Sequence, residues 1–135
     1  MRLMGRILAA AAVIGVLGTP ASAAQSIRVE LNKLEAEGGS CRAYMVTANS
    51  GDQSFQSLKL DLVMFDGEGI ISKRLAVDLG PVPPGKTRVK VFGIDGVGCQ
   101  RIGRVLLNEV LTCDGTDGCG DLIAVGSRSD VPFVE

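Results

Sequence analysis

The chain of 135 residues has no histidine, no tryptophan and a single tyrosine. Without histidine, the usual base that activates a serine or cysteine nucleophile is absent, and so is a preferred ligand of zinc. The scarcity of aromatic rings leaves little for stacking sugars or bases. The 14 Lys and Arg residues do not exceed the 15 Asp and Glu residues, which disfavours nucleic acid as a partner. We therefore expect no enzymatic activity and, apart from the calcium considered below, no cofactor.

Long hydrophobic runs are also scarce, and the one that stands out lies at the N-terminus. Arg2 and Arg6 begin it, and residues 7–17 form an apolar core too short to span a bilayer comfortably. Pro20 and then the small residues Ala-Ser-Ala at 21–23 complete the pattern of a cleavable signal peptide. We expect cleavage after residue 23, rather than an uncleaved anchor or a buried helix.

The separated arginines favour the general secretory route, and no cysteine follows the cut, which disfavours a lipoprotein. We expect a periplasmic protein, or else a secreted one, with no membrane span in the mature chain. The remaining 112 residues, 24–135, make one domain with 12 basic and 15 acidic residues, a net charge of −3. All four cysteines lie in this part, and an even count in an oxidising compartment predicts two disulfides.

The apolar residues of the mature chain alternate with a period of two. Residues 26–34, SIRVELNKL, show the pattern of a half-buried strand. Seven strands are predicted in this way, at 26–34, 41–49, 57–66, 70–79, 86–94, 104–113 and 122–125. The sixth would also suit a helix, but strands flank it and no helix cap is present. The expected fold is all-β, a single antiparallel immunoglobulin-like β-sandwich over residues 24–126.

Three details of this fold are predicted from side-chain patterns. The outer end of the third strand carries Val63 and Phe65 on its polar face, so something should cover it. In the fifth strand, alternation should point Val89 and Val91 inward. Residues 127–135 are expected to be a C-terminal tail, in which Phe133 either docks or frays.

Basic residues gather in two stretches that alternation should leave facing solvent. They are Lys73 and Arg74, and then Lys86, Arg88 and Lys90, of which the last three share one side of their strand. A solvated strand face is the favoured interpretation. The alternative is a patch for an acidic partner.

Strand reversal predicts how the cysteines pair. If successive strands alternate in direction, Cys41 and Cys99 lie at one end of the sandwich, whereas Cys113 and Cys119 lie at the other. A ten-residue strand spans about 33 Å, whereas bonded cysteines need Cα atoms within about 7 Å. Only the pairing Cys41–Cys99 with Cys113–Cys119 fits.

The loop within the short disulfide, CDGTDGCGD, has an alternative interpretation as a metal site. Asp114, Asp117 and Asp121 are hard oxygen ligands suited to calcium. Their spacing does not match an EF-hand loop, and Asp and Gly are also ordinary turn residues. A stapled turn is favoured, with weak calcium binding as the rival.

Acid–base chemistry would need two carboxylates facing one pocket. Asp61, Asp66 and Asp95 are the candidates that folding could bring together. A solvent face, a hairpin and a loop explain them equally well, so a small hydrolase is the third hypothesis.

Residues 41–113 resemble the FxLYD-like and CARDB-like group of bacterial extracytoplasmic immunoglobulin-like domains, and also small exported proteobacterial proteins with four cysteines. The matching positions are Asn49, Phe65-Asp66, Gly69 and Pro84-Gly85, although Val63 replaces the leading aromatic residue and the cysteines are not part of the general pattern. The resemblance implies fold and location, and it brings no catalytic residues.

Together these observations predict an exported, disulfide-stapled binding module with a protein partner in the cell envelope. Its contact surfaces would be an exposed sheet edge, used by strand addition, and the loops at the Cys41/Cys99 end. The alternative is a calcium-binding or inhibitor-type protein that presents the Cys113–Cys119 loop.

Overall fold

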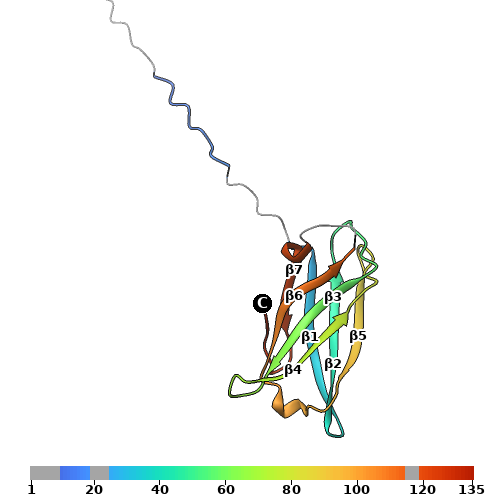
Figure 1. Cartoon of the computed structure of the whole chain (residues 1–135). Coiled ribbons are helices and arrows are strands. Elements are labelled where there is room, and N and C mark those ends of the chain that lie inside the picture. Colours follow the sequence, from blue (N-terminus) through green and yellow to red (C-terminus); the bar gives the residue numbers. More distant parts are fainter. Residues whose placement is uncertain (1–9, 19–24, 115–118) are drawn as a thin grey trace, which may run out of the picture.

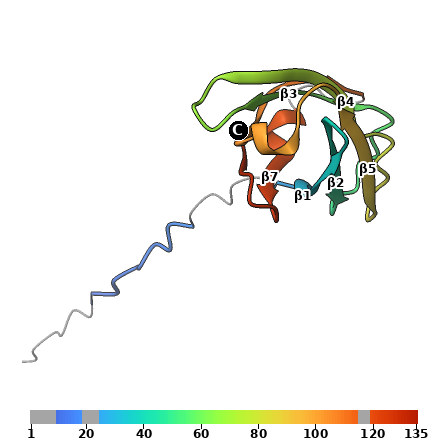
Figure 2. The same cartoon turned by 90° about the horizontal axis from the view of Figure 1, so that it is seen from below.

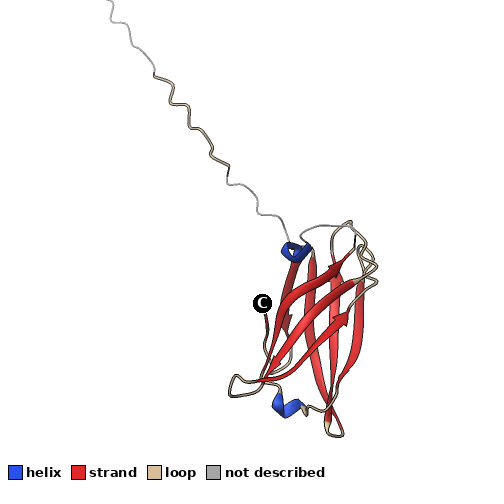
Figure 3. Cartoon of the chain, in the orientation of Figure 1, coloured by secondary structure: helices blue, strands red, loops and turns tan. Residues whose placement is uncertain are grey.

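The computed structural model describes residues 10–18, 25–114 and 119–135 of the chain, and its elements are labelled in Figure 1. The strands are β1 Ile27–Glu37, β2 Ser40–Asn49, β3 Leu58–Phe65, β4 Ile71–Asp78, β5 Thr87–Ile94, β6 Arg104–Cys113, β7 Ile123–Ser127 and β8 Phe133–Val134. Two 3-10 helices, η1 Cys99–Arg101 and η2 Cys119–Leu122, lie at opposite ends of the strands (Figure 3).

Residues 10–18 form neither helix nor strand, and the predicted cleavage site at 21–23 lies outside the described residues. Within the described part of the chain, no helix has the length and apolar character needed to cross a membrane.

The strands form two four-stranded sheets, with the orders β5-β2-β1-β7 and β4-β3-β6-β8. Figure 2 shows the sheets as two layers, with β5 at the outer end of its layer. The predicted all-β sandwich is therefore confirmed. The expectation of purely antiparallel strands is wrong at two places, since β1 pairs with β7 and β6 pairs with β8 in parallel. Both exceptions follow from strand alternation. If direction reverses at each successive strand, all odd-numbered strands run one way and all even-numbered strands the other, so β1 with β7 and β6 with β8 must be parallel.

The core lies between the sheets and is built from one face of each inner strand. In β2, alternate residues from Cys41 to Asn49 are buried, and in β3 the residues Leu58, Leu60, Leu62 and Met64 are. The predicted cover over the outer end of β3 comes from its neighbours in the sheet. The Arg104 guanidinium lies 4.4 Å from the centre of the Phe65 ring, and Val63, between Arg74 and Leu106, is 6% exposed.

The predicted tail is part of the sandwich in its second half. β7 continues to Ser127, and after a short turn Phe133 pairs with Val105 in β6 and is buried. Docking occurs because Phe133 fills the space between the sheets. The sequence pattern missed β8 because two residues are too few to show a period.

Both disulfides are present, and they join the pairs that strand alternation favoured. Cys41 is bonded to Cys99 and Cys113 to Cys119, with Cα–Cα distances of 4.9 and 6.4 Å. The first closes 58 residues, which corresponds to about 4 kcal/mol of chain entropy. The second closes 6 residues, worth about 2 kcal/mol. Two structural disulfides indicate an oxidising, exported environment.

The residues that carry the family resemblance hold turns. The Asn49 side chain donates to the carbonyl of Gln53 at 2.7 Å and accepts the N–H of Gly51 at 3.0 Å. Asp66 accepts the N–H groups of Glu68 and Ile70 across the β3–β4 hairpin. Gly69 and Gly85 have φ angles of 80° and 68°, which disfavour any side chain.

Candidate interaction surface at the edge of β5

β5 is an edge strand. It pairs with β2 on one side, and the part of the chain that the structure describes supplies no strand on its other side. Residues 79–86, which connect β4 to β5, include three prolines and cross from one sheet to the other. Because proline lacks a backbone N–H, this connection is poorly suited to adding a ladder of its own. Backbone groups along β5 are thus left available for pairing.

The register with β2 decides which face each β5 side chain occupies. The buried Met45 lies opposite Lys90, and the half-buried Tyr44 lies opposite Val91. Directly opposed residues share a face of the sheet. Lys90 therefore lies on the face toward the other sheet, whereas Val91 lies on the outer face.

The prediction that Val89 and Val91 point inward is therefore wrong. Val89 is 62% and Val91 45% exposed, and Arg88 and Lys90 occupy the opposite face. The two cations stay exposed there because β5 lies at the margin of the sandwich, where only Ile94 at its end is buried. Valine has a high strand propensity and arginine a low tendency to be buried, so composition favoured the wrong face.

A shallow groove lies beside this edge, between β5 and the connection that precedes it. It has a volume of about 200 Å³ and is lined by residues 79–81 together with Arg88, Val89 and Lys90. The walls therefore combine two cations with apolar surface. Such a groove can hold the side chains of an added strand that combine negative charge with apolar carbon.

The cations of β5 make no ion pair with the described residues. The ion pairs that the structure shows use Arg28, Lys33, Arg42, Arg74 and Arg128, all outside β5. Lys90 acts electrostatically on the carboxylate of Asp78 and helps to lower its pKa.

That carboxylate is already used within the fold. Asp78 accepts the hydroxyl of Ser57 and the backbone N–H groups of Leu58 and Gly80 at 2.9–3.0 Å. Burial acts to raise the pKa of Asp78, but these hydrogen bonds outweigh it and lower the pKa below its ordinary value. Asp78 is therefore engaged by hydrogen bonds within the fold and forms no ion pair with Arg88 or Lys90.

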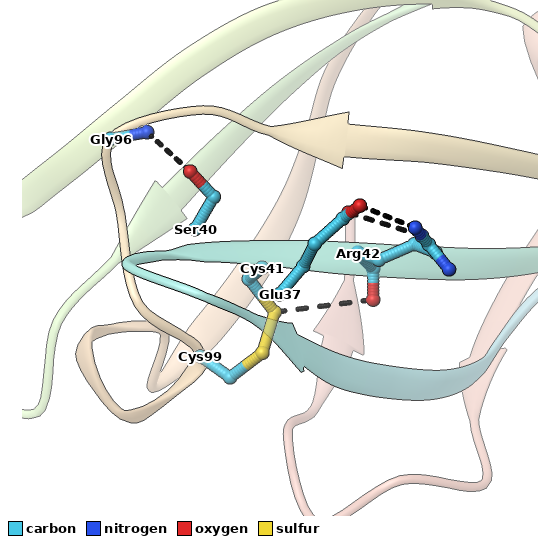
Figure 4. Close-up of a disulfide and its surroundings, with 6 residues drawn as sticks. All are labelled: Glu37, Ser40, Cys41, Arg42, Gly96 and Cys99. Atoms are coloured by element: carbon cyan, nitrogen blue, oxygen red, sulfur yellow. Dashed lines mark hydrogen bonds and ion pairs between the residues drawn. A yellow bond between two sulfur atoms is a disulfide. The ribbon is translucent and has the colours of Figure 1, made fainter.

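The outer face beside β5 differs, because its charges are paired internally. Arg42 bonds the carboxylates of Glu35 and Glu37, and Lys33 bonds Glu35 at 2.8 Å. The Lys33 ammonium, followed by the Tyr44 hydroxyl, lowers the pKa of Glu35. Figure 4 shows the Arg42–Glu37 pair of this cluster at the end of the β1–β2 hairpin that carries the Cys41–Cys99 bond.

The second predicted contact surface, at the Cys41/Cys99 end, contains an open hollow of about 470 Å³. The bulge of β1 at residues 32–34, the η1 residues Cys99 and Gln100, and residues 128–131 line it. Its cations are paired, since Arg128 bonds Glu30 at 3.2 Å and Lys33 bonds Glu35. The β5 edge therefore offers more unused bonding capacity than this hollow.

Of the three aspartates predicted to bind calcium, one is used in hydrogen bonds within the fold, one is exposed, and one lies outside the described residues. Asp114 accepts the N–H groups of Gln56 and Ser57 at 3.1 and 2.8 Å and so ties the start of β3 to the end of β6. Asp117 lies outside the described residues, and Asp121 is exposed in η2. Among the described residues, no group of three or more ligands is placed to hold a metal ion.

The three candidate carboxylates for hydrolysis lie at separate places. Asp66 holds the β3–β4 hairpin, and Asp95 is exposed in the turn after β5. Asp61 lies on the outer face of β3, as predicted, yet is only 3% exposed because Arg74 and Asn108 cover it. The Arg74 guanidinium, and then the Asn108 amide, lower the pKa of Asp61. A carboxylate held ionised in this way is suited to a structural ion pair.

The Asp61–Arg74–Asn108 cluster was not predicted from the sequence. Arg74 donates to both oxygens of Asp61, at 2.9 and 2.8 Å, and Asn108 donates at 2.8 Å. Alternation does place Asp61 on the outer face, which was the available signal. The pairing with Arg74 depends on the β3–β4 register.

Comparison with known proteins bears on the fold. No family model matches the chain, and no curated protein matches it significantly. Among solved structures, the fold is similar to that of IrmA from Escherichia coli, with a TM-score of 0.56, 12% sequence identity, and coverage of 73% of this chain and 89% of IrmA. At this identity the likeness concerns the fold alone, and the resemblance to FxLYD-like and CARDB-like domains stays a prediction.

Proposed function

We propose that this chain is an exported, non-enzymatic binding module of the bacterial periplasm that takes up an extended protein segment at the free edge of β5. The observation that carries the proposal is a strand that, among the described residues, pairs on one side only and is exposed on both faces along nearly its whole length. An edge of this kind recognises a partner through main-chain hydrogen bonds, while alternate side chains supply specificity.

The location is part of the same proposal. The N-terminal pattern supports export by the general secretory route, and the two disulfides support an oxidising destination. The two-layer sandwich with alternating strand directions supports an immunoglobulin-like type of the kind that FxLYD-like and CARDB-like domains represent.

Export can be tested by blocking cleavage. Ala23→Phe places a bulky side chain where signal peptidase accepts only small ones, so the full-length precursor should accumulate. N-terminal sequencing of the unaltered exported protein should begin at Ala24. A start at any distant position would contradict the predicted signal peptide.

Binding at β5 can be tested by photo-crosslinking in the cell envelope. A photoreactive residue at Thr87, which is exposed in β5, should give discrete crosslinked products, whereas one at Lys59 in the other sheet should not. Val89→Lys with Val91→Lys should abolish the Thr87 products, because charges on the outer face oppose an apolar partner strand. Unchanged products in this double variant would show that the edge is not the binding surface.

A further inference from the structure

We infer that the segment added to β5 is a stretch of a partner protein in which acidic and apolar residues alternate. This inference rests on the proposed function and specifies the chemistry of the partner. It follows from three features of the edge: its alternation, its unpaired cations and its unfitness for self-pairing.

The alternation of β5 dictates the alternation of its partner. Arg88 and Lys90 lie on the face toward the other sheet, and Val89 and Val91 lie on the outer face. In an added strand, each residue opposite a β5 residue shares its face, whichever direction the strand runs. A partner that matches both faces must present acidic and apolar side chains in turn.

No carboxylate of the described residues supplies the negative charge that such a partner would bring to Arg88 and Lys90. The two cations have no ion pair among those residues, and Asp78 is occupied by three hydrogen-bond donors. Acidic side chains opposite the two cations would enter the groove beside residues 79–81, where the exposed ring of Pro81 offers apolar contact for their methylene groups.

A second copy of this chain is a poor occupant of the same edge. In a symmetric antiparallel pairing centred on Val89, Arg88 of one copy would lie opposite Lys90 of the other. Like charges that face each other across strands are destabilising. The cations therefore oppose self-association in this register and favour acidic strands.

The test uses short capped peptides and the oxidised protein. The first peptide is Glu-Val-Glu-Val-Glu-Val, the second replaces each Glu by Lys, and the third is the first with backbone N-methylation at alternate residues. We expect the Glu peptide to bind about tenfold more tightly than the Lys peptide, since several cross-strand charge pairs change sign. N-methylation on the pairing side should abolish binding, and amide NMR shifts should map to β5.

Two charge-matched variants provide the decisive control. Arg88→Glu with Lys90→Glu should reverse the preference, so that the Lys peptide binds more tightly than the Glu peptide. Lys59→Glu with Arg101→Glu changes the net charge equally at exposed positions outside β5, and it should leave the preference unchanged. Raising the salt concentration should lower the affinity of the Glu peptide, because salt screens exposed charges.

Three results would overturn the inference: equal affinity for the Glu and Lys peptides, no detectable binding of either, or shifts that map to the hollow at residues 32–34 and 128–131. Thr87 crosslinks that persist in Arg88→Glu/Lys90→Glu would leave the binding edge standing and refute only the acidic partner. Peptide binding at β5 without any Thr87 crosslink in the envelope would instead refute the proposed function.

Discussion

The two long sides of the sandwich end in different ways. On one side, β7 and β8 contact each other. Hydrogen bonds hold the turn between them: the Ser127 hydroxyl donates to the carbonyl of Val131 at 2.6 Å, and the N–H of Arg128 donates to the carbonyl of Leu31 in β1 at 2.9 Å. On the other side, β5 pairs only with β2 in the part of the chain that the structure describes, and its side chains are exposed on both faces.

The difference shows how a connection decides whether an edge stays open. The turn at 128–132 returns the chain to the second sheet close enough for Phe133 to enter the core. The longer loop at 79–86 changes sheets without adding a strand. The closed side thus uses its polar groups for stability, whereas the cations of β5 on the open side form no ion pair with the described residues.

The largest expected effect contrasts the buried Phe133 of the closed side with the exposed Val91 of the open side. Phe133→Ala should lower the free energy of unfolding by about 3–5 kcal/mol, because it removes a ring that is 4% exposed. Val91→Ala in β5 should change it by less than about 0.5 kcal/mol. Urea unfolding of the oxidised variants measures both, and similar losses would show that the two sides are equally closed.

A smaller effect is expected from the hydrogen bonds of the closed side. Ser127→Ala removes the hydroxyl that bonds Val131 and accepts the N–H of Ser129, and it should cost about 1 kcal/mol. Thr87→Ala, at the start of the open edge, is the matched control. If Thr87→Ala were the more destabilising of the two, the open edge would contribute more to stability than the closed side.

Acid should loosen the hydrogen bonds that Asp78 accepts on the open side. The pKa of Asp78 is lowered in the folded protein, so its contribution to stability is complete above the unfolded-state pKa and is lost as the pH falls through the folded value. The hydrogen bonds of Ser127 contain no titrating group. The amide signals of Leu58 and Gly80 should therefore titrate below the ordinary range of aspartate, and Asp78→Asn should remove this titration.

The smallest effect on stability is expected at the cations proposed to bind the partner. Arg88→Glu with Lys90→Glu should change the free energy of unfolding by no more than about 0.5 kcal/mol, since both side chains are exposed and lack ion pairs among the described residues. Thermal unfolding monitored by circular dichroism would check this. A large loss would mean that these cations support the fold.

Much of the fold could be predicted, because period-two alternation marks strands wherever one face is buried. The sixth strand was correctly preferred over a helix, and the cysteine pairs followed from strand direction alone. The short strand at Phe133 and the ion pair of Asp61 with Arg74 could not be predicted. Both depend on which strands become neighbours, and that information is non-local.

The sequence by itself determined that strands alternate, that residues 41 and 99 meet at one end, and that Val89 and Val91 share a side opposite Arg88 and Lys90. Only the tertiary structure decided which side of β5 looks outward. Alternation relates neighbouring side chains to each other, but the register with β2 and the position of β5 at the margin of the sheet determine which of its faces meets the core.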